Sequence, residues 1–155
     1  MLAPALGEAE GDHAEHVMVF AWRMLVAGRA RCPVLRDELA AAAGAQAMDV
    51  LSALSVFLTT LGNGSRHRLC VGPPRCSHRT TDEQAMLALI AAAQDGDEER
   101  VAAHLRWLVV PDQRDAVSRS VQALAELADR ASLHIPAPVR QHIQGGRRLE
   151  VLDRS

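Results

Sequence analysis

The stretch AQAMDVLSALSVFLTTLG, residues 45–62, decides the expected fold class because its apolar residues recur at helical spacing. Intervals of three and four residues connect Val50, Leu51, Leu54, Phe57, Leu58 and Leu61. This spacing places them on one face of an α-helix, and such a face must pack against other helices to leave water. Gly44 before the stretch and Gly62 at its end predict where helices stop.

Helical patterns continue toward the N-terminus. Apolar residues between Val17 and Leu25 predict a helix from about His13 to Gly28, with Asp12 as its N-cap. Pro33 is suited to the first turn of a short second helix that ends at Gly44.

The same reading extends toward the C-terminus. Thr80 and Glu83 have the spacing of a capping box and predict a helix to about Gln94. Another helix begins near Glu98, and Asp112 is expected to cap a long helix to about Ala131. We therefore expect an all-α, single-domain bundle of six or seven helices. We expect the chain to have three parts: a flexible acidic N-terminal tail (1–11), the helical domain (12–144) and a flexible C-terminal tail (145–155).

Composition supports a helical core. The chain of 155 residues has no Lys and no Tyr, all 17 of its cationic residues other than His are Arg, and its aromatic residues are two Phe and two Trp. A core of Leu, Val and Ala favours helices over sheets, which are usually rich in β-branched and aromatic residues. The exclusive use of Arg is typical of a GC-rich bacterial coding bias.

The cellular location of the protein is predicted from two features: whether any apolar stretch could span a membrane, and whether the first residues resemble a signal peptide. Val17–Gly28 is shorter than the eighteen apolar residues of a membrane span and contains Arg23. The acidic start lacks the basic region of a signal peptide. We expect a cytoplasmic protein, not bound to membranes, whose three cysteines stay reduced.

Residues 63–80, which we call the Cys/His loop, contain the candidate metal ligands. Cys70, Cys76 and His78 flank the turn Gly72-Pro73-Pro74, and zinc favours four such sulfur and nitrogen ligands. Cys32 is the predicted fourth ligand, and His67 is its reserve. The chain has no paired CxxC motifs, so ordinary cysteines and a redox-reactive thiol remain alternatives.

The same loop is basic. Arg66, Arg68, Arg75 and Arg79 lie in a stretch, residues 50–81, that has no acidic residue. Arg binds carboxylate and phosphate groups, so these four predict contact with an acidic partner or with phosphate. The resulting functional hypothesis is a small cytoplasmic regulatory or adaptor protein. It would contact a protein partner or form a homodimer, with the Cys/His loop as a zinc-stabilised, arginine-rich contact element.

The alternative is a winged-helix-like DNA-binding transcription regulator that uses residues 34–80. Ala40, Gly44 and Val50 have the spacing of a helix-turn-helix, and the Cys/His loop would form a short β-hairpin as its wing. The helix that would read the bases, in residues 45–54, has Asp49 and no Arg, which argues against base recognition. No nucleotide-binding or hydrolase motif is found, so we expect a protein that is not an enzyme and name no catalytic residue.

Overall fold

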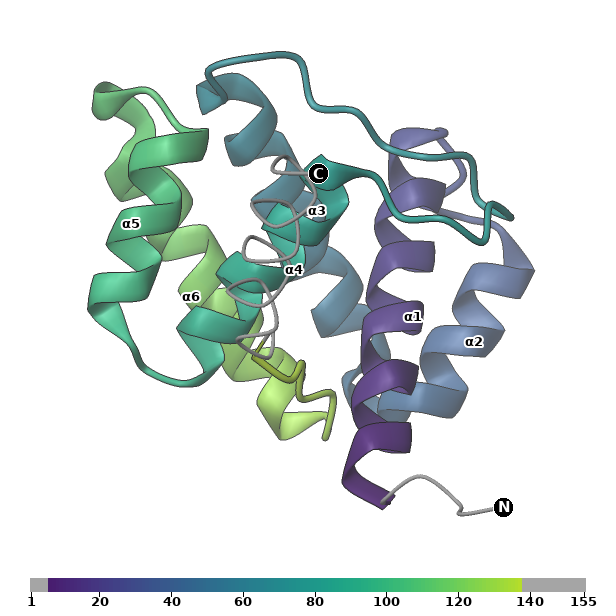
Figure 1. The fold of residues 1–155 in the computed structure, drawn as a ribbon. Helices are drawn as coiled ribbons and strands as arrows, with labels where there is room; N and C mark the ends of the chain where they lie inside the picture. The colour runs from purple at the N-terminus through teal and green to yellow at the C-terminus, as the bar shows by residue number, and fades with distance from the viewer. Residues whose placement is uncertain (1–5, 138–155) are drawn as a thin grey trace, which may run out of the picture.

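The structure is a computed structural model that describes residues 6–137, and this part of the chain is all-α, which confirms the predicted fold class. In chain order the elements are α1 (Leu6–Val26), α2 (Pro33–Ala43), η1 (Gly44–Gln46), α3 (Ala47–Gly64), α4 (Thr81–Gln94), α5 (Glu98–Leu108), η2 (Pro111–Gln113) and α6 (Arg114–Arg130). Figure 1 shows the helices running in several directions around a common core.

The predicted six or seven helices in one bundle do not match the structure. The 3₁₀ turn η1 joins α2 to α3 without a non-helical residue, and η2 leads directly into α6, so the described residues form five helical runs. At the first junction Gly44 has φ 57°, and its N–H donates to the carbonyl of Ala40. Glycine adopts this positive φ without steric cost, so the chain bends there yet remains helical.

Several predicted helix ends are placed differently. α1 begins at Leu6, before the expected N-cap Asp12, so part of the expected tail 1–11 is helical. Asp112 lies inside η2 and does not cap α6. The capping box of Thr80 and Glu83 and the position of Pro33 in the first turn of α2 are confirmed. Residues 1–5 and 138–155, with the expected tail 145–155, lie outside the described residues.

The core lies where α3 packs between α1 and α2 on one side of the chain order and the α4–α6 helices on the other. α3 packs against α6, α4 packs against both α5 and α6, and α1 packs against α2 and α3. Trp22 of α1 and Phe57 of α3 are fully buried, and the apolar spacing of residues 45–62 predicts the burial of Phe57. The α3 face predicted from residues 45–62 is therefore the contact surface of the central helix.

The Cys/His loop crosses over the molecule between α3 and α4. Its first two residues belong to the end of α3, and the rest passes over the C-terminal end of α1 before returning to α4 (Figure 1). The expected β-hairpin is wrong, because the loop forms no strand; Ser65 makes only an isolated bridge to Val109. The loop instead depends on side-chain contacts, described below.

The helical run Pro33–Gly64 has a composition that the sequence analysis did not single out. Among the described residues it is the one stretch long and apolar enough to cross a membrane, with a mean hydropathy of 1.5 in its best window. Core helices of water-soluble proteins pass the same test, and α3 buries seven residues against the rest of the chain.

Candidate functional site: the Cys/His loop and its cleft

A buried ion pair lies beneath the Cys/His loop. The Nε of Arg23, in the last turns of α1, donates to Glu83 Oε2 at 2.6 Å, and its Nη2 donates to Glu83 Oε1 at 3.0 Å. The Arg23 side chain is 4 % exposed and that of Glu83 is fully buried. The two-pronged geometry matches the guanidinium to the carboxylate and gives the strongest form of this contact.

Arg23 also binds the backbone of the loop. Its Nη1 donates to the Cys76 carbonyl and its Nη2 to the His78 carbonyl, both at 2.7 Å. These bonds compensate the guanidinium for the water that it loses on burial. One side chain of α1 therefore fixes the outer part of the loop at two points.

Glu83 completes the arrangement from the first turn of α4. Its carboxylate accepts hydrogen bonds from the Trp22 indole at 3.2 Å, from the Thr80 N–H at 3.0 Å and from the Gly72 N–H at 3.3 Å. Burial alone would raise its pKa, but the hydrogen bonds from Arg23, Thr80 and Trp22, with the charge of Arg23, lower the pKa to about 2. Glu83 is therefore ionised at neutral pH.

Asp82, next in the chain, holds the first half of the loop. Its carboxylate accepts from the Cys70 N–H at 2.7 Å and pairs with the His67 imidazole Nε2 at 2.9 Å. Burial opposes ionisation, but these two hydrogen bonds dominate and lower the pKa of Asp82. The Thr80 hydroxyl donates to the Cys70 carbonyl at 2.6 Å. The first half of the loop is thus bound to the N-terminus of α4, whereas Arg23 of α1 binds its outer part.

Gly72 is one of the loop residues whose backbone meets the ion pair. A Cβ atom at this position would lie 3.1 Å from Arg23 Nη2 and 3.3 Å from Glu83 Oε1. These distances are tighter than most carbon contacts, so a side chain here would have to displace the pair. The glycine of the Gly-Pro-Pro turn is therefore explained by close approach to the ion pair.

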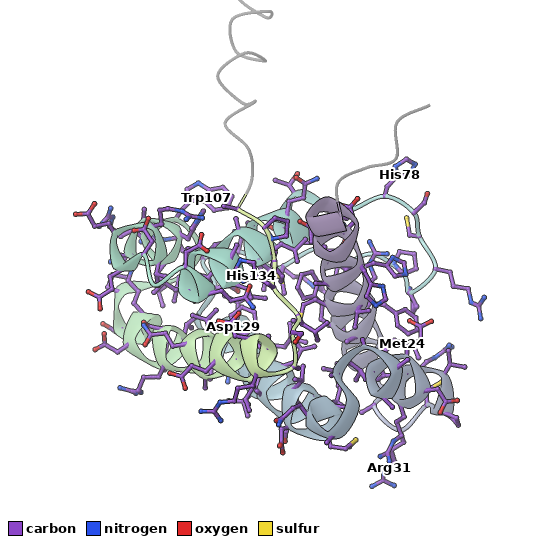
Figure 2. The ribbon with its side chains drawn as sticks, turned by 90° about the horizontal axis from the view of Figure 1, so that it is seen from below. Met24, Arg31, His78, Trp107, Asp129 and His134 are labelled. Atoms are coloured by element: carbon purple, nitrogen blue, oxygen red, sulfur yellow. The ribbon has the colours of Figure 1, made fainter. Side chains whose placement is uncertain are left out.

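The predicted metal ligands are not brought together. Cys32 is half-buried at the N-cap of α2, whereas Cys70, Cys76 and His78 are exposed in the loop. His78 lies on the outer side of the loop (Figure 2). Between residues 6 and 137, no three Cys, His, Asp or Glu side chains gather as a metal site. The reserve ligand His67 pairs with Asp82, and its ring meets the Trp107 ring edge-on at 6.2 Å.

The four predicted arginines divide into two groups. Arg79 forms an ion pair with Glu15 of α1, and Arg66 Nε donates to the Arg106 carbonyl at 3.1 Å. Arg68 and Arg75 are exposed and form no ion pair with any residue that the structure describes. Their guanidinium groups, and the charge of Arg66, which also lacks a described ion pair, are therefore available to a partner.

A cleft of about 610 Å³ lies between α1, α2 and the Cys/His loop. Its lining residues are His16, Val19, Phe20, Arg23, Val34, Glu38, Pro74, Arg75, Cys76, Ser77 and Arg79. We call it the loop cleft. Its lining combines apolar side chains with the charged side chains of Arg23, Glu38, Arg75 and Arg79.

Sequence analysis missed the residues that organise this site. Arg23 was noted only as an interruption of an apolar stretch and Glu83 only as part of a capping box. The available signal was a lone charge within an otherwise apolar helix, because a buried charge requires a partner of opposite sign.

Comparison with protein-family models, with curated proteins and with solved structures finds no match for this chain.

Proposed function

We propose that this is a small cytoplasmic regulatory or adaptor protein, not an enzyme, that binds an acidic surface of a partner protein through its Cys/His loop. The observation that carries the proposal is the exposure of Arg68 and Arg75 on a loop whose backbone is bound to buried side chains. An irregular segment with such extensive internal bonding is suited to contact rather than to simple connection.

The first step of the argument is preorganisation. Binding orders flexible segments and costs free energy, and a loop that is already ordered avoids much of that cost. Arg23, Asp82 and Glu83 bind backbone groups of the loop at Cys70, Gly72, Cys76 and His78. The arginine side chains are therefore presented from backbone positions that are set before a partner arrives.

The second step concerns charge. The protein has a net charge of −2, yet the loop carries four arginines and no acidic residue. Arg68 and Arg75 can each donate a pair of parallel N–H bonds to a carboxylate. An acidic protein surface offers such carboxylates, while the overall negative charge of the molecule disfavours adhesion at other faces.

The proposal requires neither a bound zinc ion nor a winged-helix fold. The loop has a sufficient set of side-chain contacts to order it, and the candidate ligands do not gather among the described residues. For the DNA-binding alternative, residues 65–80 offer no strand from which a wing could be built. DNA binding therefore becomes a competing outcome of the experiment below.

The test is fluorescence anisotropy with a fluorescein-labelled peptide of ten glutamates at low salt. We compare wild type with the double variant Arg68→Gln/Arg75→Gln. The matched control is Arg119→Gln/Arg130→Gln, which removes two exposed arginines from α6. Two exposed charge pairs of about 0.5 kcal/mol or more each predict a loss of about fivefold or more for the loop variant.

The control variant has the same net charge as the loop variant, so it separates a local contact from a general charge effect. Equal weakening by both double variants would refute the loop as the contact element. Tighter binding to a labelled DNA duplex than to the peptide, lost in the loop variant, would replace the acidic-protein proposal with the nucleic-acid alternative.

A further inference from the structure

The loop cleft offers a second binding site, beside the acidic-protein contact. We propose that it binds a small amphipathic molecule with one negatively charged group at the loop end and an apolar body between α1 and α2. This inference does not rest on the proposed function, although Arg75 takes part in both. The argument follows from the shape, the apolar walls and the charges of the cleft.

The shape comes from three elements. On α1, residues 16, 19, 20 and 23 form one stripe along the helix, with the i, i+3, i+4, i+7 spacing of a single face. On α2, Val34 and Glu38 lie one turn apart and form the opposite wall. The loop, from Pro74 to Arg79, closes one end. A volume of about 610 Å³ lies within the usual range for small-molecule sites.

The apolar walls account for the body of the ligand. Val34 is 49 % exposed and is one of five large apolar residues with such exposure among the residues whose burial is described. Across the cleft, Phe20 is only partly buried. Pro74 adds a rigid apolar surface from the loop. A ligand with an aliphatic or aromatic body would remove all three from water, which is favourable in proportion to the area covered.

The charges determine where the anion binds. Arg79 is compensated by Glu15 and Arg23 by Glu83, so Arg75 is the uncompensated cation of the loop end. Arg23 has five N–H donors, of which four hydrogen bonds are made within the described residues. The second Nη1 N–H has no hydrogen-bond partner among the described residues, and it belongs to a residue that lines the cleft.

Glu38 restricts the ligand further. It is exposed on the α2 wall and forms no ion pair with any described residue. A second negative charge on the ligand would lie near this carboxylate and be repelled. The ligand class is therefore an apolar carboxylate, sulfonate or phosphate diester with a single negative charge, rather than a nucleotide or another polyanion.

The experiment uses 8-anilinonaphthalene-1-sulfonate, an aromatic monoanion whose fluorescence rises in apolar surroundings, with the full chain at neutral pH. The expected result is saturable binding that Arg75→Gln weakens by about fivefold. Arg68→Gln is the matched control, because Arg68 is also exposed in the same loop but does not line the cleft. It should leave the dissociation constant within about twofold of wild type.

A second pair of variants tests the apolar wall. Val34→Asp should abolish saturable binding, whereas Val56→Asp, at an exposed valine of α3, should not. The site itself is located by ¹H–¹⁵N spectra, which contain two indole signals. The Trp22 signal should shift, because its N–H contacts Glu83 beside Arg23, and the exposed Trp107 signal should not. Circular dichroism verifies that each variant is folded.

Absence of saturable binding to wild type would overturn the inference. So would equal weakening by Arg75→Gln and Arg68→Gln, or a shift of the Trp107 signal alone. The two proposals fail separately: Arg68→Gln should weaken binding of the glutamate peptide but not of the sulfonate, and Val34→Asp should do the reverse.

Discussion

At the scale of single residues, Arg23 and Glu83 determine whether the Cys/His loop keeps its shape. Removing two charges from water is costly, and the pair is stable only because further hydrogen bonds compensate both groups. The pair contacts the backbone at Gly72, Cys76, His78 and Thr80, and it contacts the Trp22 indole. Replacing both charges by apolar side chains would leave these partners without a bond, so the pair is difficult to replace.

The variant Glu83→Gln should lower the free energy of unfolding by about 3–5 kcal/mol at pH 7, because it leaves the buried Arg23 without its counter-charge. The pKa of Glu83 falls from an ordinary value of 4.5 to about 2 on folding. Its contribution is thus fully present above about pH 4.5 and is lost as the pH falls toward 2. The measurement is urea denaturation of wild type and variant across this range.

The difference in stability between wild type and Glu83→Gln should therefore shrink on acidification. Glu126→Gln, at an exposed glutamate of α6, is the control and should change stability by less than about 0.5 kcal/mol. A difference that stays constant from pH 7 to pH 2 would show that Glu83 acts through its shape and not through its charge.

At the scale of elements, the start of α4 has two tasks. The Thr80 hydroxyl accepts from the Glu83 N–H at 3.0 Å, which caps the helix, and it donates to the Cys70 carbonyl, which binds the loop. Thr80→Ala should cost about 1–2 kcal/mol because both bonds are lost. Thr80→Ser should restore most of that loss, and Thr81→Ala at the neighbouring exposed position should cost little. Thermal denaturation of the three variants measures this, and an equal effect of Thr80→Ala and Thr81→Ala would refute it.

Helices and their ends were the features of the fold that could best be predicted from the sequence. Apolar spacing over residues 45–62 and the Thr80–Glu83 capping box depend on neighbours three or four positions away, so both could be predicted. The junction at Gly44 was read as a stop, because a glycine alone does not distinguish the end of a helix from a bend. The contact of Arg23 with Glu83 joins residues sixty positions apart, and no local pattern records such a partner.

At the scale of the whole molecule, the Cys/His loop connects parts of the chain that are distant in sequence. Arg23 comes from α1, and Asp82 and Glu83 come from α4, so loosening the loop should also loosen the contact between α1 and α4. Composition indicated an important loop, since cysteines and arginines concentrate there. It could not indicate that the buried contacts of the loop are made by its backbone, which has the same donors and acceptors at nearly every residue.

The final prediction follows from this division between backbone and side chains. If the ion pair and Asp82 order the loop, treatment with a strong chelator should leave the melting temperature unchanged. Cys76→Ser should shift it by no more than about 2 °C, since the Cys76 thiol is exposed and its carbonyl remains to accept from Arg23. Arg23→Gln should lower it by about 10 °C or more. Scanning calorimetry of the three samples, with elemental analysis of the purified protein, makes the comparison. One zinc ion per chain and a large chelator-induced fall would instead assign the order of the loop to Cys32, Cys70, Cys76 and His78, because only bound metal would then explain the lost stability.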